Sequence, residues 1–156
     1  MSISSQEKER SVRSVYRPVS ANRREFFRVI FQVPLKGSMQ VVEIMGKKIE
    51  AGGAPVLIED TGLGGLCFTS NINLPTHPEL ILQISFSLAD EYFVFSGKLK
   101  RRQDENGLFT YGLEFMIKEE GRQELFVALT KLQVKMRNDL LAKGYDWYEG
   151  SKRDFF

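Results

Sequence analysis

The feature that most constrains the fold is a series of closely spaced segments in which apolar and polar residues alternate. The clearest one runs from Leu80 to Leu88, where every second residue is a large apolar one. This period of two is typical of a β-strand with one buried face. Further strands are expected at 26–33, 39–45, 55–59, 66–69, 92–102 and 108–117. Because no helical pattern separates these segments, they favour an antiparallel β-barrel over a parallel sheet.

Two short signals define the ends of some of these strands. Asn106-Gly107 stands between two extended segments, and both residue types tolerate a positive φ, so a two-residue hairpin turn is predicted there. Pro34 lacks a backbone donor, so we expect the first strand to end near it.

The pattern changes to a helical one after the last strand. Apolar residues then recur at steps of three and four, at Leu125, Leu129, Leu132, Met136 and Leu140. This spacing predicts one long C-terminal helix of roughly 25 residues with a single apolar face. Gly144 is expected to end it.

The chain divides into three expected regions. With 156 residues, of which 42% are hydrophobic, it can form one core but hardly two. Residues 1–22 have few apolar side chains and are expected to form a flexible basic arm. Residues 23–143 are expected to form the barrel and its helix, and 144–156 an aromatic tail.

Charge is concentrated near the N-terminus. Residues 1–24 hold six basic and two acidic side chains, whereas the whole chain has a net charge of only +2. A basic arm on a slightly acidic body suggests an anionic partner, although a solvated tail without a partner has the same composition. The overall charge is too small for a protein that coats nucleic acid.

The residue inventory argues against several functions. One cysteine, Cys67, and one histidine, His77, leave no spaced set of metal ligands and little material for a catalytic centre. We therefore expect neither a metal site nor an enzyme. No apolar run approaches the roughly 20 residues that span a bilayer. The N-terminus shows no secretory signal, so a cytoplasmic location is expected.

Two local motifs offer binding chemistry. The first, Arg23-Arg24-Glu25-Phe26-Phe27-Arg28, joins the arm to the first strand. Arg24 and Arg28 are four residues apart, so they share a face of an extended chain, and guanidinium groups match phosphates or a guanine edge. The second motif is the glycine-rich turn from Asp60 to Gly65, where a carboxylate can accept hydrogen bonds from guanine. Glycines there let the backbone approach a ligand closely.

In this order and spacing, the two motifs resemble those of the PilZ domain family. Residues 24–28 match its R-x-x-x-R motif, and 60–65 match its (D/N)-x-S-x-x-G motif, except that Gly62 replaces the serine. The segments RREFFRV and YGLEF are also similar. The resemblance covers roughly residues 23–143. It implies a mainly β fold, a six-stranded antiparallel β-barrel with a long C-terminal helix, that binds cyclic di-GMP.

The resemblance also implies roles for individual residues. Arg24 and Arg28 would hold the guanines and phosphates, and Arg23 would assist from an arm that folds over the ligand. Asp60 would bind a guanine edge, and Gly65 would keep the turn open. Gly62 removes one hydroxyl, which corresponds to about 1 kcal/mol, so Gly62→Ser is expected to tighten binding.

We therefore expect a cyclic di-GMP receptor that changes the conformation of its arm on binding and signals to an unidentified effector protein. Other interpretations stay open, and one of them is a degenerate module that binds only proteins. A barrel that binds single-stranded nucleic acid would use the same arginines. The helix can pack on the barrel, or it can also form a homodimer.

Overall fold

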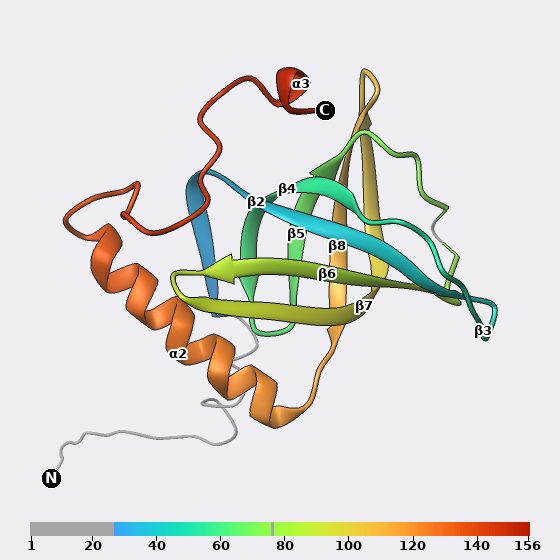
Figure 1. Ribbon diagram of the computed structural model, residues 1–156, viewed down its shortest axis with the longest axis horizontal. Helices are drawn as coiled ribbons and strands as arrows, with labels where there is room; N and C mark the ends of the chain where they lie inside the picture. Colours follow the sequence, from blue (N-terminus) through green and yellow to red (C-terminus); the bar gives the residue numbers. More distant parts are fainter. Residues whose placement is uncertain (1–26, 76) are drawn as a thin grey trace, which may run out of the picture.

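A computed structural model describes residues 27–75 and 77–156. Within them the chain forms a mainly β fold, a closed six-stranded antiparallel barrel with one long helix (Figure 1). The predicted fold class is thereby confirmed. The arm at 1–22, together with Arg23 and Arg24, lies outside the described residues.

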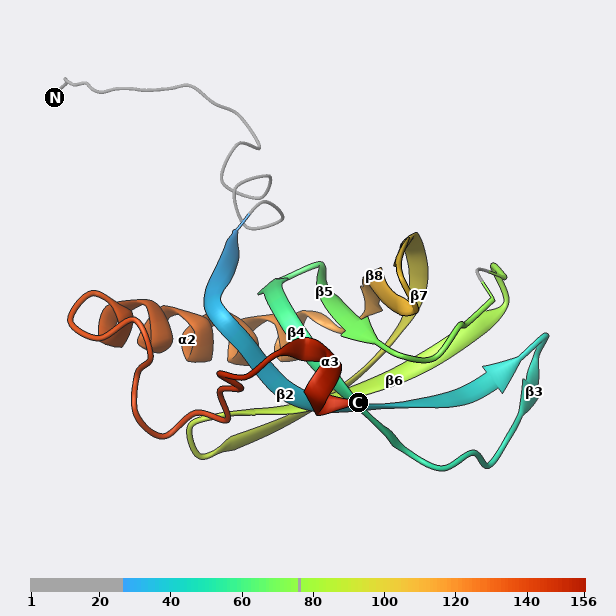
Figure 2. The same ribbon diagram turned by 90° about the horizontal axis from the view of Figure 1, so that it is seen from above.

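Neighbouring strands follow the order β3-β2-β4-β5-β8-β7-β6, and β2 also pairs with β6 to close the barrel. Every pairing is antiparallel. The two-residue strand β3 only folds back on the end of β2 (Figure 2). The bounds are β2 Arg28–Ile44, β3 Lys47–Lys48, β4 Ala54–Gly62, β5 Gly65–Ser70, β6 Leu80–Leu88, β7 Glu91–Glu105 and β8 Leu108–Met116.

The barrel interior is filled by the apolar face of each strand. Side chains of β6 alternate strictly between buried and half-buried positions, as the sequence pattern predicts. Phenylalanine rings from β6, β7 and β8 form a contiguous cluster with centroids 4.9–6.1 Å apart. The buried Tyr111 hydroxyl donates to the carbonyl of Ile72 and accepts from the N–H of Leu74. Burial raises the pKa of this phenol.

The predicted end of the first strand at Pro34 is wrong. Strand β2 runs through it to Ile44, and residues expected as a separate second strand belong to the same element. Its register against β4 shifts between Ile30 and Leu35, so Pro34 lies where the ladder needs no donor. The predicted hairpin at Asn106-Gly107 is confirmed, because both residues have a positive φ between β7 and β8.

Helix α2, Glu119–Met136, is shorter than the roughly 25 residues that the apolar spacing predicts. Its buried residues Leu125, Leu129 and Leu132 pack into the barrel core, but Leu140 lies beyond the helix and is exposed. The Asp139 carboxylate accepts from the N–H of Leu141, a local bond that competes with helix continuation. In Figure 1 the helix lies beside the barrel, near the turn between β6 and β7.

The C-terminal segment returns across the barrel and pairs with β2 at its irregular part. The N–H of Lys36 donates to Asp146, and the N–H of Tyr148 donates to Pro34. The Trp147 ring packs edge-on against Phe31 at 5.3 Å. The short helix α3, Lys152–Phe155, follows. No helix among the described residues is long and apolar enough to cross a membrane.

Candidate functional site

Arg28 and Asp60 lie together at one edge of the barrel. Arg28 begins β2, and Asp60 lies near the end of β4, paired with Ile30. Asp60 is two residues from Gly62, the residue that pairs with Arg28, so the side chains of Arg28 and Asp60 lie on the same face of the sheet. The Arg28 guanidinium donates from Nη1 to Oδ1 of Asp60, and the side chains are 41% and 21% exposed. The basic and acidic residues of the two motifs, 32 positions apart in sequence, therefore form one ion pair.

The two motif glycines occupy different structural positions. Gly62 is the last residue of β4 and pairs with Arg28, and a Cβ there would lie 2.6 Å from the carbonyl oxygen of Phe27. Gly65 is the first residue of β5, and a Cβ there would lie 2.1 Å from the carbonyl oxygen of Leu113. Gly65 thus allows β5 to approach β8, whereas the resemblance implied that it keeps the turn open.

The turn between β4 and β5 consists of Leu63 and Gly64. The Leu63 side chain is buried in the core, which anchors the turn. Thr61 is fully buried, and its hydroxyl donates to the carbonyl of Gly62. It therefore does not replace the hydroxyl that the family has at position 62.

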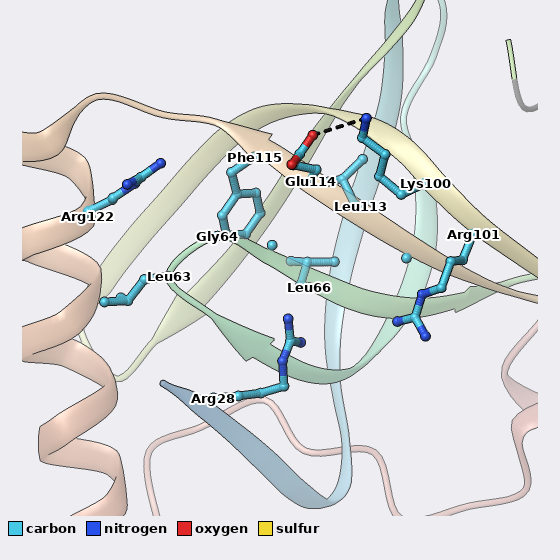
Figure 3. A pocket seen from close by; sticks show the side chains of 12 residues that line it. Arg28, Leu63, Gly64, Leu66, Lys100, Arg101, Leu113, Glu114, Phe115 and Arg122 are labelled. Carbon is cyan, nitrogen blue, oxygen red and sulfur yellow. Dashed lines mark ion pairs between the residues drawn. The ribbon is translucent and has the colours of Figure 1, made fainter. Parts of the chain in front are cut away.

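A cavity of about 500 Å³ opens beside this turn, lined by residues of β2, β5, β7, β8 and α2. Among the described residues, its basic side chains are Arg28, Lys100, Arg101 and Arg122, and its single acidic one is Glu114. Figure 3 shows the guanidinium groups of Arg28, Arg101 and Arg122 on three sides of the cavity. Lys100 forms an ion pair with Glu114 at 3.2 Å. The cavity therefore carries an excess of positive charge.

Arg101 reaches the cavity because β8 has no side chain beneath it. A register shift between Leu99 and Arg101 places Arg101 opposite Gly112. A Cβ on Gly112 would lie 2.9 Å from the Arg101 Nε. The Arg101 side chain thus lies directly against the backbone of β8 at Gly112.

Lys100, Arg101 and Arg122 are not among the residues that the motifs indicate. Lys100 and Arg101 belong to a basic run, 98–102, on a predicted strand, and the sequence offers no sign of which face they occupy. Arg122 stands in the first turns of the helix, far in sequence from either motif. Only the closure of the barrel brings these cations beside Arg28.

The chemistry of this site is suited to binding. The Cys67 thiol lies opposite Asp60 in the ladder, and its pKa is raised by burial and by the Asp60 and Glu59 carboxylates. It stays protonated at neutral pH and is a poor nucleophile. The described residues contain no cluster of three metal-ligating side chains. Guanidinium groups around a glycine-lined floor can hold an anion that has flat surfaces.

Comparison with protein families gives a match over most of this chain. The sequence profile described as the PilZ domain matches residues 22–131, which includes both motifs, all the strands and most of α2. No curated protein sequence matches this chain significantly.

Several solved structures share the fold. The Bacillus subtilis inhibitor of motility, MotI/DgrA, superposes with a TM-score of 0.52 at 14% identity, covering 69% of this chain and 49% of that one. Escherichia coli YcgR, solved in complex with c-di-GMP, gives 0.54 at 13% identity, with 72% and 46% coverage. K. pneumonia MrkH, solved in its apo state, gives 0.54 at 9% identity, with 81% and 55% coverage. This chain spans about half the length of these proteins.

Proposed function

Because the chain belongs to the PilZ domain family, we propose that it is a receptor for cyclic di-GMP and not an enzyme. The observation that carries the proposal is the Arg28–Asp60 ion pair beside a cavity rich in arginine. The structure of E. coli YcgR, which has the same fold, was solved in complex with c-di-GMP, and this supports the choice of ligand.

Guanine offers partners to both members of the ion pair. Its O6 and N7 atoms can accept from the planar donor fork of Arg28, while its ring N–H and amino group can donate to Asp60. A half-exposed ion pair is worth roughly 0.2–1 kcal/mol. The pair in the free protein therefore holds both side chains near their binding positions at little cost to ligand entry.

The phosphates of the ligand require cations beyond this pair. Arg101 lies in the same cavity as Arg28. The one carboxylate that β8 brings to this cavity is that of Glu114, and it is already paired with Lys100. Arg23 and Arg24 join the proposed site on the strength of the family motif. In this proposal the arm folds over the bound ligand and an effector protein senses the change.

The test is a calorimetric titration with cyclic di-GMP. We expect a dissociation constant in the micromolar range or tighter, weakened at least tenfold by Arg28→Ala, which corresponds to about 1.4 kcal/mol. Arg102→Ala is the matched control, because this exposed arginine on β7 stacks over Phe109 and does not line the cavity. Its affinity should equal that of the wild type.

Two results would refute the proposal. One is the absence of heat and of any shift in melting temperature at saturating ligand. The other is tighter binding of single-stranded RNA with a steep salt dependence, which would instead indicate a nucleic-acid-binding barrel.

A further inference from the structure

Arg122 of α2 lines the same cavity as Arg28 although it belongs to neither sequence motif. It approaches from the helix side, near Leu63 of the turn and Phe115 of β8, whereas Arg28 approaches from β2 (Figure 3). A ligand seated over the turn and β8, which are hydrogen-bonded to each other through Gly64 and Phe115, would therefore meet guanidinium groups from two directions.

The side chain of Arg122 is left with an unmet hydrogen-bonding need. Its Nε is buried and has no hydrogen-bond partner among the described residues. Buried donors in proteins are nearly always paired, and a guanidinium keeps its charge at any physiological pH. The nearby carboxylate of Glu114 is already paired with Lys100. The guanidinium of Arg122, which lines the cavity without a carboxylate partner among the described residues, can therefore donate to an anion that enters there.

The fold holds Arg122 in a well-defined place. Its backbone N–H donates to Lys118 at 3.1 Å, and Leu125, three residues on, is fully buried in the core. The preceding residue, Gly121, lies against the connection between β8 and α2, where a Cβ would be 3.0 Å from the Ile117 side chain. A cation fixed on a packed helix loses less conformational entropy when it binds than one on a mobile chain.

We propose that Arg122 is a further ligand-binding residue, which donates from its guanidinium to a phosphate of the bound cyclic dinucleotide. This inference rests on the proposed function and adds helix α2 to the binding surface. A ligand with two phosphates suits it, because Arg122 and Arg101 are each without a carboxylate partner among the described residues.

The test compares substitutions at two positions of α2 by calorimetry with cyclic di-GMP. We expect Arg122→Gln to weaken binding at least fivefold. Arg122→Lys should bind with intermediate affinity, because an ammonium keeps the charge but lacks the donor fork. Lys131→Gln is the matched control, since Lys131 is exposed on the same helix and does not line this cavity. It should bind as the wild type does.

A second measurement separates binding from a structural role. Because the described residues offer the Arg122 Nε no partner, Arg122→Gln should not lower the melting temperature without ligand. A lowered melting temperature together with no recovery of affinity in Arg122→Lys would overturn the inference in favour of a structural role.

The affinities distinguish the two proposals. If the wild type binds and Arg28→Ala weakens binding, but Arg122→Gln binds within twofold of the wild type, only the role of Arg122 is refuted. If the wild type does not bind cyclic di-GMP at all, the proposed function fails and the role of Arg122 fails with it.

Discussion

Gly62 determines how closely the first strand approaches the motif turn. It stands where the PilZ family has serine, and it pairs directly with Arg28. A side chain there would meet the carbonyl oxygen of Phe27, a backbone atom, at 2.6 Å. The glycine thus removes one hydroxyl from the motif and in return lets the start of β2 lie tightly against β4.

This contact changes the prediction for Gly62→Ser. From the sequence alone we expected tighter binding through the restored hydroxyl. The structure leads us to expect that the substitution lowers the free energy of unfolding by about 1–3 kcal/mol, because the backbone of β2 must shift to admit the Cβ. We also expect that its affinity for cyclic di-GMP does not improve. Chemical denaturation and calorimetry measure the two quantities.

The neighbouring glycine is the control for this prediction. Gly64 lies in the turn that follows Gly62, lines the cavity, and has open space where its Cβ would be. Gly64→Ser should therefore change stability by no more than about 0.5 kcal/mol. Equal stability of Gly62→Ser and the wild type would show that β2 yields easily at Phe27.

At the scale of the element, helix α2 has two functionally different faces. Leu125, Leu129 and Leu132 point into the barrel core, whereas Val127 and Val134 are about half exposed. The buried face explains why the helix lies beside the barrel, and it accounts for the apolar stripe without a second chain. The helix position in turn decides where Arg122 lies.

We predict a large difference between the two faces on truncation to alanine. Leu129→Ala should lower the free energy of unfolding by about 2–5 kcal/mol, because it leaves a cavity in a fully buried place. Val134→Ala, at a position 50% exposed, should cost less than about 0.5 kcal/mol. Urea denaturation followed by circular dichroism measures both. Equal losses would mean that the helix does not pack on the barrel as described.

At the scale of the whole molecule, the C-terminal segment is joined to the barrel at several separate places. Trp147 forms a bridge with Leu35 of β2, Lys152 forms an ion pair with Glu59 of β4 at 2.8 Å, and Arg153 donates to the carbonyl of Asn106. Residues that follow helix α2 therefore contact β2, β4 and the β7–β8 hairpin, and so join these parts of the barrel.

We predict that this segment and the barrel unfold as one cooperative unit. Trp147 is the only tryptophan in the chain, so its fluorescence reports on the contact between this segment and β2. The fluorescence transition in urea should coincide with the loss of β-sheet circular dichroism. Lys152→Ala, which removes only a half-exposed ion pair, should leave the two transitions coincident. A fluorescence change at lower urea than the circular dichroism change would contradict this prediction.

Local sequence patterns were sufficient for much of the fold. The alternation in 80–88 corresponds to β6, and Asn106-Gly107 forms the turn between β7 and β8. These features depend on the conformational preferences of adjacent residues, which the sequence displays directly. The run of strands without intervening helices likewise predicted an antiparallel barrel, and the resemblance of the two motifs to those of the PilZ family implied that Arg28 and Asp60 belong to one site.

The features that local patterns missed depend on residues far apart in the chain. Strand β2 continues through Pro34 because the C-terminal segment forms hydrogen bonds with the carbonyl of Pro34 and with the N–H of Lys36. Lys100, Arg101 and Arg122 line the cavity because the register of β7 on β8 and the packing of α2 bring them there. The sequence by itself determined most of the strand segments, where one hairpin turns and, through the family resemblance, that Arg28 and Asp60 share a site. Closure of the barrel decided where the cavity forms and which further cations line it, because strand pairing between distant segments sets which side chains lie next to one another.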